Sequence, residues 1–134
     1  MQNRDKKEVL NESHKMRMTV AYGLERFWGE QFRLEKQNKD KANYWKVVWQ
    51  KVAEILQEAG IKLPNKEIRS NNPNKQQKEV EETQNIRQMA EAIWKMEPDD
   101  RAIALMVLTQ FCDSLVWWTQ RYKKRDKNGN RSGG

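Results

Sequence analysis

The chain has 134 residues, a length typical of one ordinary domain with a single modest core. Lysine and arginine total 26 against 19 acidic residues, so the formal net charge is +7, which favours a polyanionic partner without identifying it. Six Trp and six Met exclude a disordered chain, and a single His with a single Cys excludes a Cys/His zinc site and a disulfide framework.

The first helix is expected over residues 9–34, where apolar side chains recur at helical spacings. They are Val9, Leu10, Met16, Val20, Leu24, Phe27, Trp28 and Leu34. Gly23 and Gly29 each weaken a helix interior by about 1 kcal/mol relative to alanine, which predicts a bend near Phe27 and Trp28 or close packing there. Residues 1–19 are polar and contain no apolar targeting segment, so we expect a cytoplasmic protein.

The second helix follows a polar stretch at residues 36–41 and is expected to end at Gly60. Its apolar stripe consists of Tyr44, Trp45, Val48, Trp49, Val52, Leu56 and Ala59. Residues 61–75 then contain Pro64, Pro73 and four asparagines, a composition that interrupts helices. We expect a long mobile loop there.

Two more helices are expected, over residues 76–96 and 99–124, separated by a short turn at Pro98. The last helix contains an apolar run from Ala102 to Trp118, interrupted by Thr109, Gln110 and Asp113. A helix that is apolar nearly all round is expected to be surrounded by the rest of the protein, and the polar interruptions favour a buried core helix over a membrane span. Residues 126–134 are expected to form a disordered polar tail beyond a domain of residues 1–125.

No run of β-branched residues with a period of two predicts a strand, and no internal repeat is evident. The expected fold is therefore all-α, a single-domain bundle of four to five helices with a central apolar C-terminal helix.

Candidate groups for catalysis are few. Cys112 lies in the apolar run, which favours a buried hydrophobe over a nucleophile, and a Cys–His pair with His14 is not expected. Asp113 needs a partner, and a polar stripe on the last helix or an ion pair with Arg26 or Arg87 is favoured over a perturbed catalytic carboxylate. We therefore expect no enzymatic activity, no catalytic or metal-binding residues and no cofactor, although a small enzyme built on Asp113 is a third interpretation.

Basic residues interleaved with aromatic residues occur in two places and predict nucleic-acid binding. The first basic cluster consists of Lys36, Lys39, Lys41, Lys46 and Lys51 around Tyr44, Trp45 and Trp49. The second basic cluster consists of Trp117 and Trp118 followed by Arg121, Lys123, Lys124, Arg125, Lys127 and Arg131. The competing interpretation is that the charged faces are merely solvated and that the Trp rings belong to the core.

Charge is also distributed unevenly along the chain. Residues 79–100 hold seven acids against Arg87 and Lys95, whereas the flanking segments are basic. Such a polarised body would suit a subunit that presents one side to a strand and another to proteins, including copies of itself.

The last helix, in a short, basic, all-helical chain, carries a resemblance to a known family. It opens with Pro98-Asp99-Asp100-Arg101-Ala102-Ile103-Ala104-Leu105 and closes with Trp117-Trp118-Thr119-Gln120-Arg121-Tyr122-Lys123-Lys124. The chain resembles the small subunit of CRISPR effector complexes of type I, a likeness in size, helicity and charge rather than in a diagnostic motif.

The resemblance implies a non-enzymatic, multi-copy subunit that contacts the backbone of a DNA strand and of the guide RNA–DNA duplex. Other subunits and further copies of the chain would be its protein partners, and guide pairing would supply the specificity. Neither a membrane nor a small-molecule substrate is expected as a partner. The alternative function is a helical adaptor or assembly protein that binds another protein.

Overall fold

The structure of the chain, a computed structural model, describes the backbone of residues 3–132 and the side chains of residues 11–121. Every regular element in the described backbone is helical, which confirms the all-α prediction. The elements are α1 (Asn3–Thr19), the 3₁₀ turn η1 (Val20–Tyr22), α2 (Leu24–Glu35), α3 (Lys39–Glu58), α4 (Lys75–Trp94) and α5 (Pro98–Ser132).

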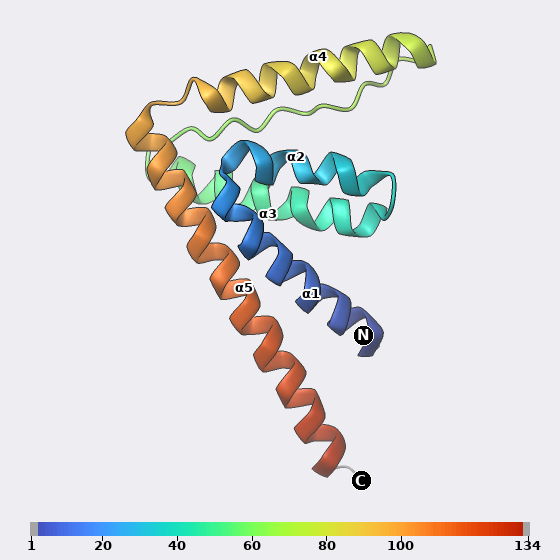
Figure 1. Cartoon of the computed structure of the whole chain (residues 1–134), viewed down its shortest axis with the longest axis vertical. Helices are drawn as coiled ribbons and strands as arrows, with labels where there is room; N and C mark the ends of the chain where they lie inside the picture. Colours follow the sequence, from blue (N-terminus) through green and yellow to red (C-terminus); the bar gives the residue numbers. More distant parts are fainter. Residues whose placement is uncertain (1–2, 133–134) are drawn as a thin grey trace.

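Two antiparallel helix pairs form the body of the molecule (Figure 1). Helices α2 and α3 form a hairpin, while α1 lies alongside α5 and runs in the opposite direction. Helix α4 crosses the top of the view next to the extended segment that precedes it, and the end of α5 projects beyond the start of α1. The short connection before α3 explains why α2 and α3 run in opposite directions, whereas α4 and α5 meet at a corner and diverge (Figure 1).

The core is built around aromatic side chains from the α2–α3 hairpin. The Phe27 ring lies 4.8 Å from the ring of Trp45 and 6.4 Å from that of Trp49, measured between centroids. Met16 from α1 and Leu108 from α5 are fully buried against this cluster. The apolar stripe predicted for the second helix therefore faces the core.

The first predicted helix is broken, but not where it was expected. Gly23 adopts φ 98° and ψ 172°, a conformation that strongly disfavours any residue with a Cβ, and it separates η1 from α2. Its amide donates to the carbonyl of Val20 at 3.0 Å. Of the two alternatives predicted near Phe27 and Trp28, the bend is wrong, because α2 runs through Gly29 to Glu35. Close packing is correct, since both side chains are buried and the Phe27 ring contacts that of Trp45.

Residues 61–74 contain neither helix nor strand, as predicted, but they are anchored rather than free. The side chains of Ile61, Leu63 and Ile68 are buried. The Trp49 indole N–H donates to the carbonyl of Pro64 at 3.0 Å, and the Asn85 amide donates to that of Ile68 at 3.0 Å. These contacts attach the segment to α3 and α4.

Asparagines mark the beginnings of two helices. The Asn38 side chain accepts from the amides of Asp40 and Lys41 at 3.1 and 3.2 Å and so caps α3. Asn74 caps α4 in the same way, accepting from the amides of Gln76 and Gln77. The polar stretch at residues 36–41 thus contains the start of the second predicted helix rather than a linker.

Helix α5 departs from the prediction in two respects. Among its described side chains only one stripe is buried, at Ala104, Leu108 and Cys112, while Met106 is 53% exposed. The expectation of a helix surrounded by protein is therefore wrong. Its backbone also remains helical to Ser132, beyond the expected end at residue 124 and through most of the segment predicted to be a disordered tail.

Within the described residues, Pro98–Arg121 is the single segment long and apolar enough to cross a membrane, judged by length and composition only. Only 17% of its most apolar window is buried, so it is not the buried core helix that was predicted. One such segment is weak support for a membrane span, because core helices of soluble proteins have similar length and composition.

Candidate nucleic-acid interface

The lysines of the first basic cluster do not form one surface. Lys39 and Lys46 are seven residues apart, about two turns, and so share a side of α3, whereas Lys41 lies on the other side. Lys51 is exposed but pairs with Glu54 at 3.5 Å. Lys36 and Lys39 are exposed and form no ion pair with any described side chain. The predicted patch is thus reduced to scattered charges.

Lys41 is occupied by a buried carboxylate from α1. Glu12 is only 2% exposed, and its Oε1 atom lies 3.4 Å from Nζ of Lys41 and 3.6 Å from Nζ of Lys15. Its Oε2 atom accepts a 2.8 Å hydrogen bond from the Trp45 indole. Lys41 therefore balances a charge inside the protein and is poorly placed to bind a phosphate.

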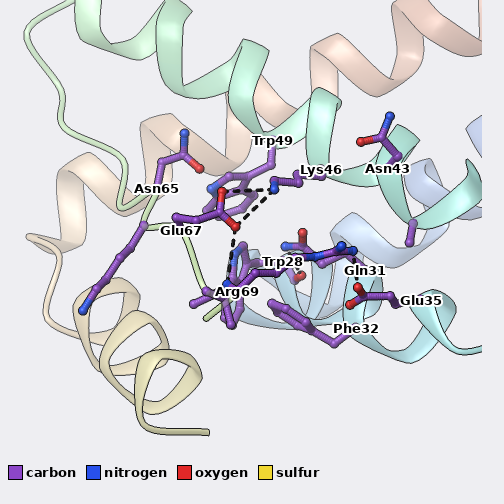
Figure 2. Close-up of a pocket in the computed structure, with 13 residues that line it drawn as sticks. Trp28, Gln31, Phe32, Glu35, Asn43, Lys46, Trp49, Asn65, Glu67 and Arg69 are labelled. Carbon is purple, nitrogen blue, oxygen red and sulfur yellow. Dashed lines mark hydrogen bonds and ion pairs between the residues drawn. The ribbon is translucent and has the colours of Figure 1, made fainter. Parts of the chain in front are cut away.

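Lys46 lies at a cavity of about 190 Å³ between α2, α3 and the extended segment (Figure 2). Trp28, Phe32 and Trp49 supply aromatic walls. Lys46 Nζ lies 3.2 Å from Oε2 of Glu67. A second ion pair joins Arg69 to Glu35 across the same cavity (Figure 2).

Two ion pairs of this cavity neutralise Lys46 and Arg69, while the third cation of its lining, Lys66, donates to the amide oxygen of Gln88. Burial alone would raise the pKa of Glu67, but the hydrogen bond from Lys46, the backbone N–H of Arg69 and the charges of both residues outweigh it and lower the pKa. An approaching phosphate would have to compete with the Glu67 carboxylate for Lys46. Lys46 is therefore a structural partner of Glu67.

The aromatic residues of the first basic cluster are not available for stacking. Trp45 and Trp49 are buried, and Tyr44 is half-buried with its hydroxyl 3.3 Å from that of Ser13. Burial raises the pKa of the Tyr44 hydroxyl. The hydrogen bond with Ser13 lowers this pKa, but by less than burial raises it. For this cluster the core interpretation is correct.

In the second basic cluster the aromatic rings are exposed to solvent, unlike those of the first. Trp117 and Trp118 are 52% and 61% exposed, and their rings meet edge to face at 5.1 Å between centroids and 85° between planes. The Arg121 guanidinium lies 5.2 Å from the centroid of the Trp117 ring, within cation–π distance. One turn of α5 thus presents two aromatic rings and a cation to solvent.

The remaining cations of the second basic cluster follow directly in the helix. Lys123, Lys124 and Arg125 lie on the α5 backbone within about one turn of Arg121, and their side chains are outside the described range. The candidate interface is defined here by Trp117, Trp118 and Arg121. Its backbone is rigid helix, so no loop closure is needed to assemble it.

Asp113 has a partner that the sequence did not indicate. Its Oδ1 atom lies 2.5 Å from Nε of Arg17 in α1, and both side chains are exposed. The prediction that Arg26 or Arg87 pairs with Asp113 is wrong, whereas the prediction of an ion pair is correct. Arg17 and Asp113 bridge α1 and α5 at the surface rather than in a catalytic cleft.

The thiol of Cys112, next to Asp113, is expected to be unreactive. Cys112 is fully buried, as predicted, and burial is the main cause that raises its pKa to about 12. A thiol that stays protonated is a poor nucleophile. Among the described side chains, no group of three or more His, Cys, Asp or Glu residues is arranged to hold a metal ion.

The contact between Trp94 and Arg101 at the surface was not predicted from the sequence. Trp94, assigned to the apolar side of its helix, is 71% exposed at the end of α4, and the Arg101 guanidinium lies 5.5 Å from its ring centroid. Arg101 also donates to the carbonyls of Trp94 and Met96, both at 3.2 Å. The pair closes the corner between α4 and α5 and lies among acidic residues such as Glu97 and Asp99.

No protein family, curated protein or solved structure matches this chain. The candidate interface rests on its geometry alone.

Proposed function

We propose that the chain is a non-enzymatic small subunit of an RNA-guided CRISPR effector complex, which binds the backbone of a target or displaced strand and packs against other subunits. One observation carries the strand-binding part of this proposal: Trp117, Trp118 and Arg121 are exposed together on one turn of α5. The all-helical fold and the excess of basic residues are consistent with the family that the sequence resembles.

The chemistry of this turn suits an unpaired strand. An exposed indole stacks on a nucleobase with about 1 to 3 kcal/mol per base, whatever the base. Arg121 and the basic residues after it would neutralise phosphates and release condensed counterions. Stacking and phosphate contacts read no base edges, so binding is expected to show little sequence preference.

The test is fluorescence anisotropy of labelled single- and double-stranded DNA and RNA, titrated with the full chain across a salt series. We expect single strands to bind best, with affinity falling as salt rises. The double variant Trp117→Ala/Trp118→Ala should weaken binding about tenfold or more. Arg121→Gln should lower the salt slope by about one.

Trp94→Ala is the matched control, because Trp94 is also an exposed indole beside an arginine but lies in an acidic region. It should leave strand binding unchanged. Absence of binding at low salt, or equal losses in the Trp94 and Trp117/Trp118 variants, would count against a strand site at this turn.

A helical adaptor is the second candidate function, and the exposed apolar residues near the α4–α5 corner favour it. Besides Trp94, these residues are Ile103, 39% exposed, and Met106, one turn further along α5. An adaptor would bind its protein partner with weak salt dependence, whereas strand binding would weaken steeply. The salt series therefore separates the two functions.

A further inference from the structure

A second surface lies away from the candidate interface, where the extended segment runs beside the last turns of α4. These elements enclose an open groove of about 540 Å³. Its apolar lining comes from Pro64 on the extended segment and from Met89, Ala92 and Met96 on or just after α4. Met89 is buried at the base of the groove, and Ala92 is exposed.

Three lysines surround this apolar lining and no carboxylate does. Lys62 and Lys66 come from the extended segment, and Lys95 from the end of α4. Lys62 and Lys95 form no ion pair with any described side chain, and Lys66 donates only to the amide oxygen of Gln88. By contrast, Lys46 and Lys51 on α3 are each paired with a glutamate.

We propose that this groove binds an acidic, apolar peptide segment of a partner protein. A bulky apolar side chain of that segment would lie on Pro64, Ala92 and Met96, where the flexible thioether of Met96 adapts to different shapes. Its carboxylates would face Lys62, Lys66 and Lys95, whose charges no acid in the groove cancels. Opposite charges on the two partners would also speed their encounter.

The composition of the groove favours a peptide over a nucleic-acid strand. No aromatic ring lines it, so it lacks the stacking platform that a strand-binding groove ordinarily provides. Methionine, proline and alanine instead offer an apolar contact that a phosphate backbone cannot use. The groove is built from α4 and the segment before it, so the inference does not depend on strand binding at Trp117 and Trp118.

The experiment is a selection of short random peptides displayed on phage, panned against the full chain, with counter-selection against Lys62→Glu/Lys95→Glu. We expect the enriched peptides to combine Asp or Glu with Leu, Ile, Phe or Trp. Synthesised and labelled, they should bind the parent chain about tenfold or more tightly than the counter-selection variant. Ala92→Glu places a carboxylate in the groove at an exposed helical position, so it should weaken peptide binding by a similar factor.

Lys75→Glu/Lys78→Glu is the matched control, since it makes the same change in net charge on the first turns of α4. It should leave peptide affinity within about twofold. The proposal would be overturned by an absence of peptides enriched over the counter-selection variant, by enriched peptides without acidic residues, or by equal losses in the control. Loss of labelled single-stranded DNA binding in Lys62→Glu/Lys95→Glu, with peptide binding intact, would assign the groove to nucleic acid instead. Failure of the Trp117/Trp118 test alone would leave this result unaffected.

Discussion

The indole N–H of Trp45 donates a 2.8 Å hydrogen bond to Oε2 of Glu12, and this contact joins α3 to α1 inside the core. A buried carboxylate is costly unless its charge is balanced and its oxygens accept hydrogen bonds. Lys41 and Lys15 supply the balancing charges, and Trp45 supplies the hydrogen bond. The two lysine charges and the hydrogen bond to Oε2 favour this buried acid, whereas Oε1 accepts no hydrogen bond from a described group.

Glu12→Ala is expected to destabilise the fold by about 1 to 3 kcal/mol, because the buried indole N–H of Trp45 loses its acceptor. Glu12→Gln retains an acceptor oxygen and should cost less. Urea unfolding of both variants measures the difference. Equal losses would show that the charge pairing with Lys41, and not the hydrogen bond, is the larger contribution.

The two glycines near the start of α2 are expected to respond in opposite directions to alanine. Gly23→Ala should cost about 1 to 3 kcal/mol, because its positive φ strains a residue with a Cβ. Gly29 lies inside α2, and a Cβ built there meets no atom within 4 Å. Gly29→Ala should therefore stabilise by about 0.4 to 1 kcal/mol through the unfolded chain.

Thermal unfolding of the two glycine variants provides the check. A lower melting temperature for Gly23→Ala and a higher one for Gly29→Ala are expected. A stabilised Gly23→Ala variant would mean that α1 and α2 are continuous in solution.

The uneven burial of α5 predicts unequal effects of truncating its apolar side chains. Leu108 is fully buried, so Leu108→Ala should cost about 2 to 5 kcal/mol. Met106 lies on the outer side, half-exposed, and Met106→Ala should change stability by no more than about 0.5 kcal/mol. Denaturant melts of the two variants compare them directly. Similar losses at both positions would indicate that a further contact covers the outer side of α5.

The ion pair at the α2–α3 cavity makes stability depend on pH. The folded pKa of Glu67 is below its ordinary value of 4.5, so its carboxylate stabilises the fold above that value. This contribution is lost as the pH falls through the folded pKa. Glu67→Gln should therefore reduce the loss of stability between about pH 5 and about pH 3.

Glu91→Gln, an exposed position on α4 without an ion pair among the described side chains, is the control for this pH series. It removes one carboxylate but no contact with a lysine. Chemical melts at each pH give the free energy of unfolding. A Glu67→Gln profile that matches the wild type would show that the Lys46 contact is too weak to perturb the carboxylate.

Much of the fold could be predicted because helices repeat with a fixed period. Trp45, Val48, Trp49 and Val52 recur three or four residues apart, and all four are buried. The burial of α5 is lower than its apolar run predicts. Such a run allows a helix to be buried on any side, but it does not show which sides have neighbours. Periodicity also did not predict the anchoring of residues 61–74, whose buried Ile68 shows no periodic pattern.

The candidate site was only half predicted. Both basic clusters combine lysine or arginine with tryptophan, and no feature of either stretch distinguishes a core indole from an exposed one. The structure separates them: Trp45 donates to a buried carboxylate, whereas Trp117 lies in solvent under Arg121.

The sequence by itself determined the helical class, the approximate extent of α3 and α4, and the burial of Cys112, because these depend on periodicity and local composition. Tertiary structure alone decided that Arg17 is the partner of Asp113, 96 residues away, and that Lys41 is paired with Glu12 while Arg121 is paired with no acid among the described side chains. Those outcomes depend on which helix faces lie against each other. Many helix arrangements satisfy the same periodic pattern, so only the packed chain selects one.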